Sequence, residues 1–246
     1  MGAVELSLVR HGESMGNVAA AEAEAAQAEV IEVPVRDADV ALSPGGQEQA
    51  RALGALFASW APEQVPDSVW SSPYKRALDT ATIALDVAGL DPAVRVDERL
   101  RDRELGILDR LTTRGVEARY PEEAARRRWL GKFYHRPPGG ESWVDLVLRV
   151  RSLMGDLDRV EDGRRVLVSC HDAMVLIFRY VCEGLTEADI LDIARADPIR
   201  NVSLTRLQRP SGEGVWSCVE FNDVSHLQDQ GAPVTKHPGD PHVRPS

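Results

Sequence analysis

Three residues with clear chemical potential stand together near the start of the chain, in the run Arg10, His11 and Gly12. A guanidinium group offers paired donors that fit phosphate oxygens, and an imidazole is a nitrogen nucleophile near neutral pH. Glycine lets the backbone approach a ligand closely, and the N–H groups of a following turn can face an anion. The triplet indicates phosphoryl chemistry, although a single run of this kind more often marks a strand end with a surface histidine.

Two further runs repeat this arrangement of a short apolar segment followed by polar residues. The run SSPYKRALDTA (residues 71–81) follows an expected strand and places Arg76 in the first turn of an expected helix. The run VLVSCH (residues 166–171) ends in His171. Because strand ends on one side of a parallel sheet converge on one crevice, the three runs predict a single pocket with two histidines and two arginines. Such a pocket would hold a phosphate group around a nucleophile.

A parallel sheet is needed to bring these runs together, and the apolar pattern of the chain predicts one. Short strands alternate with helices, which is typical of an α/β fold. We predict a three-layer α/β/α sandwich on a mostly parallel sheet, with a helical insertion over the site at about residues 98–141. Strands are expected at residues 4–9, 68–71, 94–96 and 165–169, with a closing hairpin at 202–207 and 215–221. Helices are expected at residues 17–29, 47–60, 73–88, 114–120, 121–130, 142–160, 173–182 and 187–195.

The chain of 246 residues is expected to form one domain over residues 1–225 and a flexible tail over residues 226–246. The apolar share of 43% is sufficient for a substantial core. After Phe221 the apolar pattern fades, and residues 231–246 contain four prolines and two glycines. That composition is typical of a mobile segment.

The charge balance limits the partners that the chain can bind. Lys and Arg total 29 against 39 Asp and Glu, which gives a net charge of −10. An acidic chain is a poor general binder of nucleic acid or of anionic membranes. We therefore expect no nucleic-acid and no membrane partner, and any anionic ligand must meet a local group of basic side chains.

Cysteine usage and the lack of a targeting pattern favour a cytoplasmic location. Cys170, Cys182 and Cys218 fit no CxxC spacing and cannot all pair, so free thiols in a reducing compartment are expected. The first residues lack the basic start and apolar run of a secretory signal. The most apolar later stretch, residues 173–182, is much shorter than the roughly 20 residues that a membrane helix requires.

Four ordered motifs together resemble the histidine phosphatase superfamily, in its phosphoglycerate mutase-like branch. They are LVRHGESMGN (residues 8–17), LSPGGQEQARALG (42–54), SSPYKRALDTA (71–81) and VLVSCH (166–171). The resemblance covers about residues 4–208. It implies that His11 is the nucleophile that becomes phosphohistidine, with a backbone carbonyl fixing its other ring nitrogen. It also implies that Arg10, Arg76 and His171 hold the phosphoryl oxygens and that Asn17 is a further residue of the phosphate pocket.

The proton donor is less well defined by the resemblance. The family's LxExxxG segment matches residues 100–106, where Asp102 stands at the position of the usual glutamate. We predict Asp102 as the donor, with Glu104 and then Asp172 as rivals. Asp172 follows the second histidine, where the mutase-like branch usually has glycine and where another branch has an acid that donates the proton. Glu141 is the next candidate.

Two departures from the family pattern weigh against a glycolytic mutase. Residues 107–110 read Ile-Leu-Asp-Arg where a Trp-Glu-Gly or Gln-Gly run is expected. A tyrosine that contacts substrate in those mutases would fall at Leu105. The run Arg126, Arg127 and Arg128 either meets a second anionic group of the substrate or forms a solvated helix face.

The prediction is therefore a phosphatase that hydrolyses phosphomonoesters of a small metabolite through a phosphohistidine intermediate. His11 and Asp102 would be the catalytic residues, with no cofactor and no metal, because no metal-ligand spacing is visible. Alternatives are phosphoryl transfer of the phosphoglycerate mutase type and a non-catalytic protein that binds phosphorylated ligands. A homodimer is an open alternative to a monomer.

Overall fold

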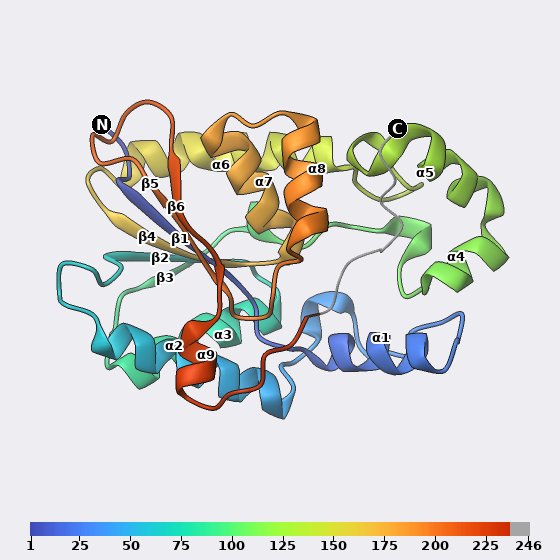
Figure 1. Ribbon diagram of the computed structural model, residues 1–246, viewed down its shortest axis with the longest axis horizontal. Helices are drawn as coiled ribbons and strands as arrows, with labels where there is room; N and C mark the ends of the chain where they lie inside the picture. The colour runs from blue at the N-terminus through green and yellow to red at the C-terminus, as the bar shows by residue number, and fades with distance from the viewer. Residues whose placement is uncertain (237–246) are drawn as a thin grey trace.

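The computed structural model describes residues 1–236 and contains one six-stranded sheet covered by helices on both faces (Figure 1). The strands are β1 (Glu5–Arg10), β2 (Ser68–Ser71), β3 (Val94–Val96), β4 (Arg165–Cys170), β5 (Leu204–Gln208) and β6 (Ser217–Asp223). Their order in the sheet is β3-β2-β4-β1-β5-β6. The first four strands are parallel, whereas β5 runs antiparallel to β1 and β6 antiparallel to β5. The prediction of a mostly parallel α/β sheet is confirmed.

The two central strands bring the two histidines to the same edge of the sheet. β1 pairs with β4 in parallel register from Glu5–Arg165 to Arg10–Cys170, so His11 and His171 are the next residues along both strands. Every residue of β1 is buried, as expected for a central strand with helices on both faces.

Helices form a layer on each face of the sheet (Figure 1). One layer contains α2 (Pro44–Ser59), α3 (Lys75–Ala88) and α9 (Ser225–Asp229), and the other contains α6 (Trp143–Val160), α7 (Asp172–Glu183) and α8 (Glu187–Ala196). Successive side chains of a strand point to opposite faces. Leu8 accordingly packs in the same cluster as Phe178 of α7, while Val9 packs with Phe57 of α2. The three-layer arrangement follows from this alternation.

The predicted insertion lies with α1 (Met15–Ala25) beyond the edge where the parallel strands end (Figure 1). It contains two short 3-10 turns, η2 (Glu98–Leu100) and η3 (Gly106–Leu108), followed by α4 (Thr113–Arg119) and α5 (Pro121–Tyr134). α5 is interrupted at Gly131, whose backbone (φ 74°, ψ 164°) is not helical, so its first part ends near residue 130 as expected and a second short part runs to Tyr134. Glycine adopts that conformation without steric cost, which allows the sharp kink between the two parts.

The first part of the expected tail, residues 226–236, has a defined structure. Residues 225–229 form α9, whose Leu227 is fully buried against the α2 and α3 layer. Thr235 then hydrogen-bonds Gln49 and Asn201. One buried leucine and a few polar contacts are enough to hold this segment, and neither produces an apolar pattern in the sequence. The remaining part of the expected tail, residues 237–246, lies outside the described residues. Within residues 1–236, no helix has the length and apolar character needed to span a membrane.

Candidate active site

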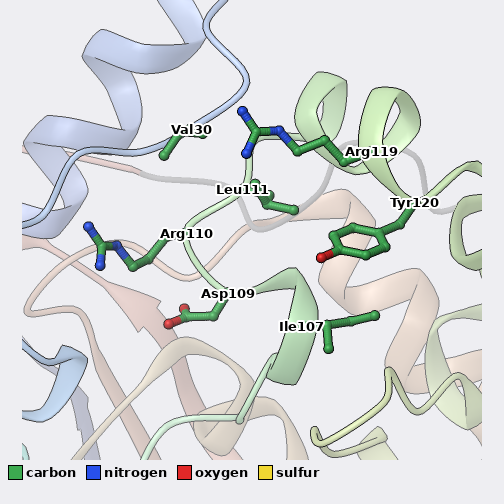
Figure 2. A pocket seen from close by; sticks show the side chains of 7 residues that line it. All are labelled: Val30, Ile107, Asp109, Arg110, Leu111, Arg119 and Tyr120. Carbon is green, nitrogen blue, oxygen red and sulfur yellow. The ribbon is translucent and has the colours of Figure 1, made fainter.

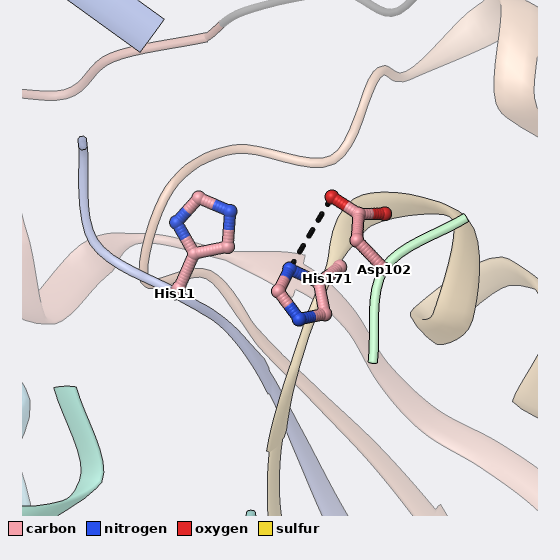
Figure 3. Close-up of side chains that lie close together, drawn as sticks. All are labelled: His11, Asp102 and His171. Carbon is pink, nitrogen blue, oxygen red and sulfur yellow. Dashed lines mark ion pairs between the residues drawn. The ribbon is translucent and has the colours of Figure 1, made fainter. Parts of the chain in front are cut away.

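Three strand ends place the predicted residues in one group at the carboxyl edge of the sheet. His11 follows β1, Arg76 lies in the first turn of α3 behind β2, and His171 follows β4. The imidazole rings of His11 and His171 are 5.1 Å apart between centroids and meet edge to face (Figure 3). Asp102 reaches the same group from the insertion. The structure thus brings these predicted site residues together.

The ring of His11 is held in one tautomer by the backbone of the next residue, Gly12. Nδ1 lies 2.7 Å from the carbonyl oxygen of Gly12, and since a carbonyl only accepts, Nδ1 donates and Nε2 keeps a lone pair. Burial lowers the pKa of His11 well below its usual value, and the charges of Arg76, His171 and Arg10 lower it further. The imidazole is therefore neutral at physiological pH, with Nε2 available for attack on an electrophile.

Arg76 uses all of its N–H groups inside the site. Its Nε donates to His11 Nε2 at 3.2 Å, and one terminal nitrogen donates to the backbone and side-chain oxygens of Asp37 at 2.7 and 2.9 Å. The other terminal nitrogen donates to Asp37 Oδ2 at 3.2 Å and to Asp102 Oδ2 at 3.1 Å. A phosphoryl group that reaches this guanidinium must replace some of these acceptors.

Sequence reasoning missed Asp37. It lies in a 3-10 turn, η1 (Asp37–Asp39), within the connection between α1 and α2. A half-exposed aspartate in a polar loop carries no local pattern that distinguishes it from a solvated charge. Only the tertiary packing of this connection against α3 reveals its contact with Arg76.

Asp102 lies between Arg76 and the second histidine. Its Oδ2 is 3.4 Å from His171 Nδ1 (Figure 3), and its Oδ1 accepts from the backbone N–H of Arg103 at 2.8 Å. On the far side of the ring, His171 Nε2 is 2.9 Å from the hydroxyl of Ser72. One carboxylate oxygen thus faces the group of basic side chains, where a leaving group would need a proton.

The rival acids occupy different surroundings. Glu104 accepts a hydrogen bond from the Tyr74 hydroxyl at 3.0 Å and is half-exposed. Burial raises the pKa of Asp172, against the opposing charges of Arg10 and Lys132. A raised carboxyl pKa suits a proton donor, so Asp172 remains an alternative to Asp102 for that role.

Glu141 is engaged in structural contacts. Its carboxylate accepts from Arg101 at 2.7 Å, from Arg149 at 3.0 Å and from the backbone N–H of Glu104 at 3.1 Å. Arg149 also donates to the backbone carbonyl of Asp102 at 3.3 Å. This pair therefore holds the loop that carries Asp102.

Arg10 and Asn17 complete the predicted pocket. Arg10 is buried and donates to the carbonyl of Ile199, while its Nε has no hydrogen-bond partner among the described residues. Asn17 uses its side-chain oxygen to accept from the backbone N–H of Ser14 at 3.1 Å, as part of the capping box of α1. That contact leaves the side-chain N–H groups of Asn17 as the donors for an anion.

A metal ion would have to compete with Arg76 for this site. One donor atom from each of His11, Asp102 and His171 lies within 4.8 Å of the others. However, Arg76 donates to both His11 Nε2 and Asp102 Oδ2. The guanidinium already supplies the positive charge that these groups face, so the arrangement fits a phosphate pocket better than a metal centre.

A side pocket of about 300 Å³ lies between the α1–α2 connection and the insertion (Figure 2). Its lining combines apolar and charged side chains: Val30, Ile107, Asp109, Arg110, Leu111, Arg119 and Tyr120. Burial raises the pKa of Asp109, and the nearby charges of Asp37 and Glu104 add to the effect. Asp109 is the one acidic residue of this lining, and it lies near enough to Asp37 for that charge to act on it.

The arginine run of α5 takes no visible part in the site. Arg126 and Arg128 are exposed, and Arg128 lies 3.9 Å from Glu117 of α4. Arg126 and Arg128 therefore fit a solvated helix face, whereas Arg127 is half-buried, and burial together with its charge lowers the pKa of Arg103 and of His135.

Comparison with known proteins gives consistent findings. A family model described as histidine phosphatase superfamily (branch 1) matches residues 6–224. A 2,3-bisphosphoglycerate-dependent phosphoglycerate mutase of Methylobacterium radiotolerans is 32% identical over 191 residues, which is 76% of this chain and 83% of the mutase. A 6-phosphofructo-2-kinase/fructose-2,6-bisphosphatase of Gallus gallus is 33% identical over 137 residues, or 56% of this chain. The match spans only 27% of that longer relative.

Solved structures agree on the fold. The mycobacterial glucosyl-3-phosphoglycerate phosphatase has a TM-score of 0.68 and 27% identity, with 90% of this chain and 99% of that chain covered. A putative alpha-ribazole-5'-P phosphatase from Escherichia coli has a TM-score of 0.71 at 18% identity, covering 90% of this chain and 98% of its own, and shows likeness of fold alone.

Proposed function

Because the chain belongs to branch 1 of the histidine phosphatase superfamily, we propose that it hydrolyses phosphomonoesters through a phosphohistidine intermediate. The observation that carries the proposal is the state of His11. Its imidazole is neutral, its Nδ1 donates to the Gly12 carbonyl, and its Nε2 lone pair faces Arg76. Binding alone would not require a nucleophile prepared in this way.

In the first step, His11 Nε2 attacks phosphorus in line, the N–P bond forms and the P–O bond to the leaving group breaks. Arg10, Arg76, His171 and Asn17 would hold the phosphoryl oxygens, because stabilisation of that charge supplies most of the catalysis in phosphoryl transfer. The Gly12 carbonyl stabilises the positive charge that develops on the ring. Asp102 would give its proton to the leaving oxygen.

In the second step, water attacks the phosphohistidine and the N–P bond breaks. The Asp102 carboxylate would take the proton of the attacking water, which returns it to its starting state, and inorganic phosphate leaves. This sequence needs no group other than the residues named, and Arg76 must turn from Asp37 toward the phosphoryl oxygens during the cycle.

Phosphoryl transfer of the mutase type is the second candidate. It is favoured by the 32% identity to the Methylobacterium mutase. Hydrolysis is favoured by the similarity to the mycobacterial glucosyl-3-phosphoglycerate phosphatase, 99% of whose chain is covered. It is also favoured by Leu105, which stands where the resemblance places a substrate-contacting tyrosine in glycolytic mutases. We propose that the substrate is a phosphomonoester of a small metabolite.

The nucleophile is tested by the variant His11→Ala. It should lose nearly all hydrolysis of an aryl phosphate while circular dichroism shows an unchanged fold. Rapid quench of the wild type with labelled substrate should trap a phosphoenzyme that is labile in acid and stable in base. Activity of the variant within a few-fold of the wild type would exclude His11 as the nucleophile.

The same preparation separates the two candidates. With 3-phosphoglycerate as substrate and a trace of 2,3-bisphosphoglycerate to phosphorylate the histidine, a phosphatase releases inorganic phosphate, whereas a mutase forms 2-phosphoglycerate. We expect no isomerisation, and faster isomerisation than phosphate release would favour the mutase.

A further inference from the structure

The catalytic loop, residues 10–13, has every backbone polar group paired from the carbonyl of Arg10 to the carbonyl of Glu13. The partners come from five separate parts of the chain and from the His11 ring itself. The carbonyls of Arg10, His11, Gly12 and Glu13 are paired in turn with Val202 N, the Asn201 side chain, the His11 ring and Ser43 N. The N–H groups of His11, Gly12 and Glu13 donate in turn to Cys170 O, the Thr80 hydroxyl and the Gln49 side chain. The position of the nucleophile therefore depends on how these partners are held.

Two of these partners are buried side-chain amides, which need orientation of their own. Asn201 donates from Nδ2 to the carbonyl of His11 at 3.0 Å. Gln49 accepts at Oε1 from the backbone N–H of Glu13 at 2.8 Å. Both side chains are fully buried, so each remaining amide atom must find a partner inside the protein.

Thr235 supplies that partner to both amides. Its hydroxyl oxygen accepts from Gln49 Nε2 at 2.8 Å, and its hydroxyl hydrogen is directed to Asn201 Oδ1 at 3.1 Å. Gln49 Nε2 also donates to the carbonyl of Pro233 at 2.8 Å, and the backbone N–H of Asn201 donates to the carbonyl of Thr235 at 3.1 Å. One hydroxyl thus contacts both amides that hold the loop.

These contacts come from a segment that follows the last strand and lies beyond residue 224, where the family match ends. We propose that residues 232–235, the C-terminal strap, position the catalytic loop, and that Thr235 is a positioning residue acting through Asn201 and Gln49 on His11. The inference rests on the proposed role of His11 as nucleophile. It assigns a function to a segment that is remote from the motifs of the pocket.

The expected effect is on the chemical step. Without the hydroxyl, Asn201 Oδ1 and one Gln49 N–H lose their partner, and the amides can turn away from the loop. A misplacement of a reacting group by about 1 Å can slow a reaction by roughly 10²-fold. The guanidinium groups of Arg10 and Arg76 are held by Ile199 and Asp37, which Thr235 does not contact, so substrate affinity should change less than the rate.

The test compares Thr235→Val, which removes the hydroxyl at constant shape, with Thr235→Ser, which keeps it. Thr235→Ala is a second variant that cannot crowd the amides, and Val234→Ala in the same strap is the matched control. Single-turnover formation of phosphohistidine from an aryl phosphate is measured with kcat and KM. We expect Val and Ala to slow phosphoenzyme formation at least ~10-fold with KM within about threefold, while Ser and the control stay within about twofold.

Equal rates in the wild type and in the Val and Ala variants would overturn the proposal. So would a loss confined to the thermal unfolding temperature, because a purely structural segment would affect stability and leave the rate of the folded enzyme unchanged. An equal loss in the Ser variant would show that the hydroxyl is not the group that acts. These failures differ from failure of the proposed function, in which the wild type itself forms no phosphohistidine.

Discussion

Three carboxyl groups are candidates for the role of proton donor, and they occupy different positions. Asp102 Oδ2 lies 3.1 Å from Arg76 and 3.4 Å from His171 Nδ1, inside the pocket. Glu104 is directed to the Tyr74 hydroxyl, and Asp172 begins α7. The donor must reach the leaving oxygen, which enters next to His11, so geometry favours Asp102.

Removal of the donor should depend on the leaving group. An alkoxide is a poor leaving group that needs a proton, whereas an aryl oxide leaves more readily. We expect Asp102→Asn to slow hydrolysis of an alkyl phosphate by about 10²–10⁴-fold, the usual range of general acid catalysis, and to slow an aryl phosphate much less. The measurement is kcat/KM for the two substrates.

Glu104→Gln and Asp172→Asn are the matched comparisons for this experiment, because each removes the same charge from a rival. If one of them shows the loss that depends on the leaving group, and Asp102→Asn slows both substrates equally and slightly, the role passes to that rival.

At the scale of elements, the connection between α1 and α2 contacts Arg76 through Asp37. It pairs with the insertion through the isolated bridge between Val30 and Leu111 and through the Thr112 hydroxyl, which donates to the carbonyl of Ala28. This pairing fixes the base of the connection, and Asp37 at its turn contacts Arg76. The carboxylate of Asp37 therefore occupies the guanidinium that the proposed mechanism assigns to phosphate.

Loss of that negative charge should strengthen anion binding. We expect Asp37→Asn to lower the inhibition constant of inorganic phosphate about threefold or more, since phosphate no longer has to displace a charged acceptor from Arg76. Asp39→Asn is the matched control, because Asp39 lies in the same turn and pairs with the exposed Arg36. Weaker phosphate binding in the Asp37 variant would mean that Asp37 holds Arg76 in its binding position.

Elements whose chemistry is local were predictable from the sequence. The strands before His11 and His171 are short apolar runs, and parallel pairing alone brings their ends together. The helix after Ser142 begins as its capping box requires. These features depend on neighbouring residues and on a general rule of topology, so one sequence is sufficient to find them.

Contacts between remote polar residues were not predictable in this way. Asp37 meets Arg76 across 39 positions, and Thr235 meets Gln49 across 186. A hydrogen bond between side chains so distant leaves no periodic pattern, and the polar composition that surrounds Thr235 is the same that indicates a mobile tail. The pocket motifs were therefore visible in the sequence, whereas the residues that support them were not.

For the whole molecule, the buried histidines couple stability to pH. Burial, followed by the charge of Arg76, lowers the pKa of both His11 and His171 well below the usual value. The unfolded chain protonates these groups at their ordinary pKa of about 6.5. Below that pH the unfolded state binds more protons than the folded state. The stability due to neutral imidazoles is thus fully present above about pH 6.5 and is lost as the pH falls.

We therefore expect the free energy of unfolding to fall between pH 6.5 and 5.5 by up to about 1.4 kcal/mol for each histidine that stays neutral in the folded state. Urea titrations at pH 7.5, 6.5 and 5.5 measure this. The double variant His11→Asn with His171→Gln should lose much less stability over the same interval. An equal loss in the double variant would place the acid sensitivity elsewhere.

The order of strands in the sheet has a consequence for the protein while it is being made. β1 lies between β4 and β5, and 160 residues separate Glu5 from its partner Arg165. At roughly 5–20 residues per second, a ribosome needs about 8–32 s to add that length. Throughout this interval the strand that ends in Arg10 has neither of its neighbours, and its apolar side chains stay open to aggregation or to a chaperone. The nascent chain therefore carries His11 long before the strands that complete its surroundings have been made.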